Sequence, residues 1–162
     1  MLDERLVAFL ESGCSIIVGI VGDDGEPHAR RGWGIDVLDA GAGRIRLLLE
    51  ANGGGPRGPG LEGWAGAPRI AITGADIHTL YSVQCKGAVV RAEALTDDDR
   101  ARHEAFCAAM FEHIHEVDGF PLEMIVRMRP NDLVALEVEV DELFDQTPGP
   151  RAGTPIAPSA GA

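Results

Sequence analysis

Apolar stretches alternate with short runs of turn-forming residues through the first third of the chain. Residues 15–21, 28–37 and 44–50 are rich in β-branched and other apolar side chains, and Gly, Asp and Pro residues separate them. Three strands joined by such short turns are expected to pair in sequence as an antiparallel β-meander. The pattern therefore predicts a β-rich fold that opens with a meander.

Three further strands are predicted later in the chain, at 69–73, at 82–95 and within 132–144. Apolar and acidic residues alternate through the last of these, as in a half-buried strand. The stretch 82–95 is long enough to bend, and Gly87 is a candidate for a bulge or a corner. Six antiparallel strands in a chain of this size are expected to close into a small barrel, because closure removes exposed edges.

Two helices are predicted to flank the strands. Apolar residues recur at helical spacing through 2–12, and Gly13 offers a stop. Thr96 precedes three aspartates, a strong helix start, and the helix is expected to run to Val117 and end at Gly119. Its expected apolar stripe consists of Ala105, Phe106, Ala109, Met110, Ile114 and Val117.

The remaining segments are less regular. Glycines and prolines exclude regular structure from 52–60, whereas 61–67 and 121–129 are candidates for short helices. We expect one barrel domain over 1–146, followed by a Pro/Gly-rich clip and tail over 147–162.

Composition narrows the class of protein. The chain has 162 residues and a net charge of −12, from 26 acidic and 14 basic side chains, which disfavours nucleic-acid binding. No stretch approaches the roughly 20 apolar residues of a membrane span, and the acidic N-terminus is unlike a signal peptide. Three cysteines without metal-like spacing fit a reduced compartment. We therefore expect a cytoplasmic protein that binds neither membranes nor nucleic acid.

Basic charge is concentrated between residues 28 and 57, although the protein as a whole is acidic. This segment has a local excess of positive charge, and an arginine-rich patch of this kind suits a small anion. Its basic residues are Arg30, Arg31, Arg44, Arg46 and Arg57.

Strict alternation along the second strand predicts two different faces. The first, a core stripe capped by an arginine, is formed by Arg31, Trp33, Ile35 and Val37. The second is formed by Arg30, Gly32, Gly34 and Asp36. Glycine inside a strand is destabilising, so the second face indicates either a bare strip for a flat phosphorylated ring or a barrel corner that needs curvature.

The fifth strand has a polar face. Ser82, Gln84 and Lys86 lie on the same side under alternation, next to Tyr81. Such a face suits hydrogen bonds to the edge of a heterocycle, or it is an ordinary solvated sheet surface.

Three short motifs together resemble the pyridoxamine 5′-phosphate oxidase-like family of FMN-binding split barrels. They are ARRGWG at 29–34, YSVQCKG at 81–87 and FDQTPGP at 144–150. The resemblance implies a mainly β fold with helices (α+β), a six-stranded antiparallel split β-barrel. It also implies a homodimer with two equivalent flavin sites at the subunit interface. The expected function is FMN-dependent oxidation or reduction of an unidentified small molecule, in which the flavin supplies the redox chemistry.

The resemblance also implies a set of cofactor-binding positions. Arg30 or Arg31 stands where the family places an arginine near the flavin and its phosphate, and Ser82 and Gln84 match positions that contact the ring or the phosphate. The end of the third strand lacks the family's Ser/Thr and basic pair, and Asn52 and Arg57 are the available substitutes. The candidate cofactor-binding residues are Arg30, Arg31, Trp33, Asn52, Arg57, Ser82, Gln84 and Lys86.

Other readings remain open at this point. A split-barrel dimer that has lost flavin and serves as a binding or structural module is the main alternative, and haem or deazaflavin binding in the same cleft is another. Haem needs an axial ligand, for which the candidates are His28, His78, His113 and His115. No catalytic side chain is assigned. No metal site is predicted, because His103 with Cys107 and the Glu112/His115 pair each lack further ligands.

Overall fold

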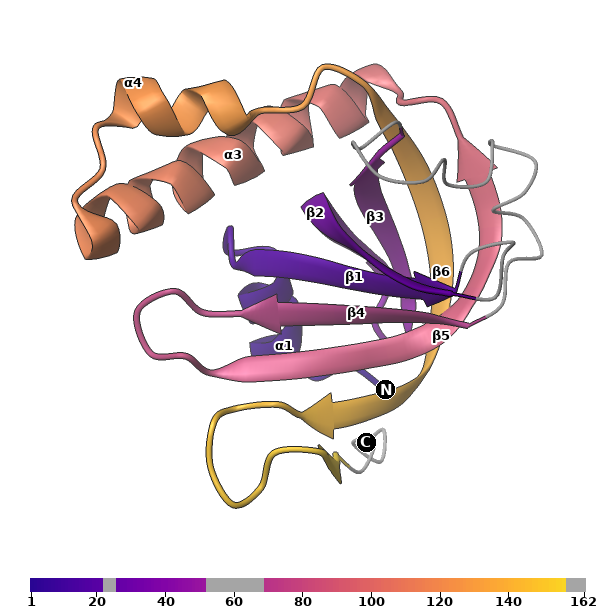
Figure 1. Ribbon diagram of the computed structural model, residues 1–162. Helices are drawn as coiled ribbons and strands as arrows, with labels where there is room; N and C mark the ends of the chain where they lie inside the picture. Colours follow the sequence, from indigo (N-terminus) through magenta and orange to yellow (C-terminus); the bar gives the residue numbers. More distant parts are fainter. Residues whose placement is uncertain (22–25, 52–68, 157–162) are drawn as a thin grey trace.

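Six strands close into an antiparallel barrel in the computed structural model, which describes residues 1–21, 26–51 and 69–156 (Figure 1). The strands follow the order β3-β2-β1-β4-β5-β6, and β3 also pairs with β6 to complete the ring. They are β1 (Ser15–Val21), β2 (Pro27–Asp39), β3 (Arg44–Glu50), β4 (Ile70–Ala75), β5 (Ser82–Glu93) and β6 (Leu133–Asp145). The predicted meander and barrel are therefore confirmed.

The barrel interior holds the hydrophobic core. Along β1, Ile16 and Val18 are fully buried, while Ile17 between them is 43% exposed on the outer surface. The predicted corner at Gly87 is confirmed, because the pairing of β5 with β6 shifts register between Lys86 and Gly87. The segment 52–60 and the candidate helix at 61–67 lie outside the described residues.

Helix α1 (Glu4–Leu10) closes one end of the barrel. Asp3 caps it by accepting a hydrogen bond from the Leu6 backbone N–H, and Leu6 and Leu10 are buried. Leu10 packs beside Gly74 near the end of β4. The helix is shorter than the predicted 2–12, because the hydrogen-bonded cap starts it at residue 4.

Helix α3 (Asp97–Asp118) has the predicted ends and packs on β2. Thr96 and Asp99 form a reciprocal capping box, and Gly119 ends the helix at a φ of 70°. The predicted apolar stripe is wrong at two positions, since Ala105 and Val117 are exposed. The buried stripe consists of Asp99, His103, Phe106, Cys107, Met110 and Phe111.

Arg46 on β3 fixes the start of α3 to the barrel. Its guanidinium donates to both carboxylate oxygens of Asp99, at 2.6 and 2.8 Å, and also to Glu93 and Glu137. The side chains of Arg46 and Asp99 are only 11% and 4% exposed. Since Arg44 pairs with Glu139, these two arginines are structural, and the predicted anion-binding patch is wrong for them.

A short helical segment follows α3 and runs back beside it (Figure 1). It comprises α4 (Leu122–Ile125) and the 3-10 helix η1 (Val126–Met128), so the candidate helix at 121–129 is confirmed. Ile125 is buried, whereas Leu122 and Val126 are exposed. The segment therefore presents apolar side chains on both its inner and outer sides.

The segment after β6 folds back onto it. Strand β7 (Thr154–Pro155) pairs with Phe144 and Asp145, and the backbone N–H of Gly153 donates to the Asp145 carbonyl oxygen. The last part of the predicted tail, 157–162, lies outside the described residues. Of the helices in the described residues, none has the length and hydropathy that a membrane crossing requires.

Candidate functional site

A β-bulge in β2 decides which way its side chains point. Gly32 pairs with Leu49 and Ile35 pairs with Leu47. Between these two pairs the chain advances three residues along β2 but only two along β3. The additional residue is accommodated at Gly34, whose φ of 156° favours glycine. Strict alternation therefore fails at this point.

The bulge splits the predicted core stripe. Arg31 pairs with Ile17 on the outer surface, and Trp33 packs outward against α3. Ile35 and Val37 pair with the buried residues of β3 and point into the barrel. The prediction that these four residues share a face is wrong, because the extra residue reverses the alternation.

The bare glycine strip predicted on β2 is also wrong. A methyl group added at Gly32 would lie 2.4 Å from Ile16 Cγ2, inside the barrel core. Gly34 faces Leu48 within the bulge. Barrel curvature and close packing explain both glycines. Of the two explanations offered from the sequence, the barrel corner is therefore the one that agrees with the structure.

The structure separates the two neighbouring arginines. Arg30 pairs with Val18, a fully buried residue, and its Nη1 donates to the Glu50 carbonyl oxygen at 3.4 Å. Arg31 lies on the outer row together with Ile17. Only Arg31 therefore shares a sheet face with the polar residues of β5.

One row of paired residues crosses the outer surface from Arg31 to Gln84. Arg31 pairs with Ile17, Ile17 with Thr73, and Thr73 with Gln84. Gln84 Nε2 donates to Thr73 Oγ1 at 3.0 Å. Three strand spacings separate the two ends of this row, so the Arg31 and Gln84 backbones lie about 14 Å apart.

The next row has almost no side chains. Ala29 pairs with Gly19, Gly19 with Ala71, and Ala71 with Lys86. A methyl group at Gly19 would meet nothing nearer than Ala71 Cβ, at 3.8 Å. We call the outer surface formed by these two rows, from Ala29 and Ile17 to Gln84 and Lys86, the platform. The bare strip that the sequence suggested on β2 lies here instead.

Basic groups gather at the Lys86 end of the platform. A groove of about 420 Å³ opens there, and its lining includes Gly19, Ala71, His28, Arg69, Lys86 and Glu142. Arg69 is held by Asp141 and Glu142, whereas the Lys86 ammonium lies 4.4 Å from the centre of the Phe144 ring. No carboxylate in the described part of the chain lies within ion-pair distance of Lys86. This end of the platform suits an anion.

Two predicted residues have local structural contacts. Ser82 is buried, its hydroxyl donates to the Leu80 carbonyl oxygen at 2.9 Å, and its backbone N–H donates to Thr147 Oγ1. Trp33 is 3% exposed and lies beneath Arg31, whose guanidinium is 5.8 Å from its ring centre. Neither side chain opens onto the platform. Asn52 and Arg57 lie outside the described residues.

His103 of α3 supports the bulge from outside. Its Nδ1 donates to the Trp33 carbonyl oxygen at 2.9 Å. Cys107 lies one turn further along α3, with its sulfur 3.6 Å from the same ring nitrogen. The pair is therefore a packing contact that fixes α3 against β2.

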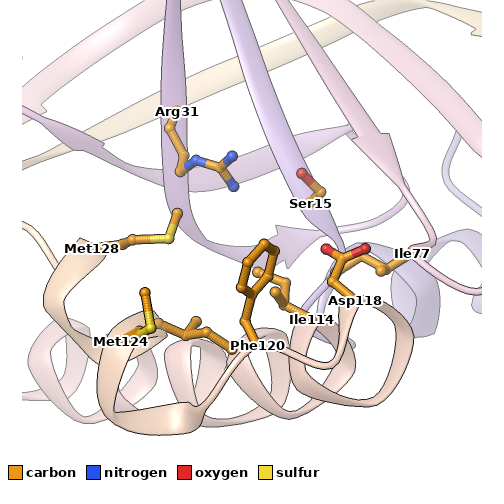
Figure 2. Close-up of a pocket in the computed structure, with 9 residues that line it drawn as sticks. Ser15, Arg31, Ile77, Ile114, Asp118, Phe120, Met124 and Met128 are labelled. Atoms are coloured by element: carbon orange, nitrogen blue, oxygen red, sulfur yellow. The ribbon is translucent and has the colours of Figure 1, made fainter.

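A pocket of about 470 Å³ lies beside the platform, between the barrel and the α3–α4 segment (Figure 2). Arg31 projects into it from β2, and the Phe120 ring stands across from the guanidinium. Its lining residues are Ser15, Arg31, Ile77, Ile114, Asp118, Phe120, Met124, Ile125 and Met128. We call it the α3–α4 pocket. Sequence reasoning identified only Arg31 among these residues, and the one available signal for the others was the apolar run after Gly119.

Cysteine and histidine chemistry adds nothing to the site. Burial raises the pKa of Cys14 and Cys85 to about 12 and that of Cys107 to about 11, so these thiols stay protonated at neutral pH. The described residues contain no group of three His, Cys, Asp or Glu side chains placed to hold a metal.

Comparisons with known proteins identify the fold. No protein-family model matches the chain, and no curated protein matches it in sequence. Among solved structures, the HupZ protein of Group A Streptococcus is 14% identical, with a TM-score of 0.52, covering 94% of this chain and 100% of that one. An F420 reductase is 16% identical, with a TM-score of 0.52, covering 88% and 98%.

A third solved structure is also similar to this chain. A pyridoxamine 5′-phosphate oxidase-related, FMN-binding protein from Nostoc punctiforme is 11% identical, with a TM-score of 0.47, covering 91% of this chain and 83% of that one. The closed six-stranded barrel with a long helix before its last strand agrees with the fold that the motifs imply. The chain therefore has an antiparallel split-barrel fold, which it shares with the HupZ protein and the F420 reductase.

Proposed function

We propose that the chain is an FMN-dependent oxidoreductase that acts as a homodimer on a small molecule. The observation that carries the proposal is the platform. Its open Gly19 and Ala71 backbone lies between an amide, Gln84, and an ammonium group, Lys86. A flat ring needs such a surface, and a side chain at Gly19 would fill it.

Each end of the platform has a separate role in this proposal. Gln84 is held by Thr73 at the ring edge, where its amide is placed to hydrogen-bond a heterocycle. Lys86, in the same groove as Arg69, is placed to bind the anionic tail. Bound flavin supplies hydride or electron transfer, and these side chains orient it.

A second copy of the chain would cover the other side of the flavin. Ile17 and Val21 stand exposed along β1 beside the bare row. Two-fold association is the commonest way to cover such a surface in a soluble protein. A dimer built on this face would enclose the platform between two barrels, which supports a composite site.

A binding module without redox activity is the second candidate. The observation that favours it is the NGGGPRGPG stretch at 52–60, which replaces the phosphate-binding pair implied by the family resemblance. A deazaflavin or haem is a further candidate ligand for the same cleft. Titration with FMN and with a deazaflavin distinguishes these candidate functions, because the binding module binds neither FMN nor a deazaflavin.

Replacing Gly19 with leucine is expected to abolish FMN binding and leave the fold intact. The new side chain points outward over the platform, where the nearest atom to an added Cβ is 3.8 Å away. FMN at 100 times its dissociation constant stabilises a binding protein by about 2.7 kcal/mol. We expect that stabilisation in thermal unfolding of the wild type and none in Gly19→Leu.

The matched control is Ala105→Leu, which adds similar bulk at an exposed position of α3. It should respond to FMN as the wild type does. Equal FMN stabilisation of Gly19→Leu and the wild type would remove the platform as the site. No stabilisation of any of the three proteins would favour the module.

A further inference from the structure

Arg31 has an unusual environment for an arginine. Its guanidinium is half-buried, lies over the Trp33 ring, and has a Met110 sulfur at 4.0 Å as its hydrogen-bond partner. No carboxylate of the described chain lies within ion-pair distance of it, although Arg44, Arg46, Arg69 and Arg102 all have such partners. Burying a guanidinium without an anion is costly, so this one is poised to bind an anion.

The walls around Arg31 define the rest of the ligand. They are apolar, and Phe120, Met124 and Met128 face the cavity (Figure 2). Thioether sulfur makes favourable contacts with aromatic rings, and Phe120 offers an aromatic edge or face. A volume of about 470 Å³ lies within the usual range for small-molecule sites. The walls therefore favour an aromatic body.

The charge balance limits the anion to one negative charge. Among the residues that the structure describes, Arg31 is the sole cation lining the α3–α4 pocket, and Asp118 contributes a carboxylate to the same lining. Asp118 repels any anion, but a phosphate dianion about twice as strongly as a monoanion, and the dianion would also exceed the single charge of Arg31. A carboxylate matches the planar fork of a single guanidinium in charge and shape.

We propose that the α3–α4 pocket binds an aromatic monocarboxylate, with its carboxylate on Arg31 and its ring between Phe120, Met124 and Met128. Arg31 also begins the row that crosses the platform to Gln84, so a ligand in this pocket lies beside the proposed flavin surface. Assignment of such an acid as the oxidoreductase's substrate rests on the proposed function. The proposal that the α3–α4 pocket binds such an acid does not rest on that function.

The test is calorimetric titration of the flavin-free protein with 1-naphthoate and with 1-naphthamide, a neutral probe of the same shape. We expect the wild type to bind naphthoate at least about tenfold more tightly than naphthamide. Arg31→Met should remove that preference, and Arg31→Lys should restore part of it. Arg151→Met, at an exposed arginine paired with Asp145, is the control and should bind both probes as the wild type does.

If Arg31→Met does not fold, a second variant still tests the proposal. Met124→Glu changes an exposed side chain on the rim of the pocket and adds a negative charge, so it should weaken naphthoate at least about fivefold more than naphthamide. Equal binding of the two probes to the wild type, no binding of naphthoate at millimolar concentration, or unchanged preference in a folded Arg31→Met would each overturn the proposal. FMN titrated into the same proteins reports separately on the platform.

Discussion

Replacement of Arg46 by methionine is expected to lower the free energy of unfolding by about 3 kcal/mol or more. Methionine replaces the aliphatic stem of the side chain but leaves Asp99 without its two guanidinium hydrogen bonds at a position where it is 4% exposed. Glu93 and Glu137 lose the same partner and keep only their contacts with the exposed Arg91. Urea unfolding at pH 7 measures the effect.

The control for this variant is Arg44→Met on the same strand. Arg44 and Glu139 form an ion pair in which both side chains are about half exposed, so its loss should change the stability by less than about 1 kcal/mol. Equal losses in the two variants would show that the Arg46 cluster does not anchor α3.

The same cluster predicts a dependence of stability on pH. Burial alone would raise the pKa of Asp99, but hydrogen bonds from Arg46 and Thr96 outweigh it and bring the pKa to about 2. Because this value lies below that of the unfolded chain, the contribution is complete above about pH 4 and is lost as the pH falls through 2. Between about pH 4 and pH 2 the free energy of unfolding of the wild type should therefore fall by about 2 kcal/mol more than that of Arg46→Met.

Replacement of Gly87 by alanine is expected to cost at least about 3 kcal/mol. The added methyl would lie 2.1 Å from the Glu139 carbonyl oxygen and 2.9 Å from Val140 Cα, which are backbone atoms that cannot move without opening the β5–β6 pairing. Gly19→Ala is the matched control, since its methyl meets only Ala71, at 3.8 Å. Chemical denaturation should leave Gly19→Ala within about 0.5 kcal/mol of the wild type. A similar midpoint for both variants would contradict the described strand crossing.

Sequence patterns predicted the strands well because each strand is locally distinct. Runs of apolar residues predicted strands at 15–21 and 44–50, and the structure has both strands with these limits. Thr96 and Gly119 likewise fixed the ends of the long helix, through capping contacts made within a few residues of each end. Local chemistry was sufficient for these features.

The direction of the β2 side chains was beyond sequence reasoning. Alternation assumes an unbroken ladder, and one additional residue at the Trp33–Gly34 bulge reverses the side chains from Ile35 to Val37. The buried stripe of α3 was misplaced for a related reason. His103 is buried against β2, where it hydrogen-bonds the carbonyl oxygen of Trp33 in the bulge. The first error comes from the irregular pairing of β2 with β3, and the second from a contact between residues 70 positions apart.

The candidate site was predicted in part. Gln84 and Lys86 do share an outer face, and Arg31 reaches the same surface, but the bare strip lies on Gly19 and Ala71, which no pattern distinguished from core positions. The α3–α4 pocket depends on how a short helix folds back beside α3, which is a tertiary arrangement. Sequence alone offered only an apolar segment there.

Sedimentation of the wild-type protein with FMN, followed by flavin absorbance near 450 nm, tests the central claim most directly. The chain has a mass of 17.2 kDa. A flavin platform at a two-fold interface predicts a boundary that carries visible absorbance at twice that mass. Flavin absorbance that stays with the free small molecule, or that moves with a single chain, would contradict it.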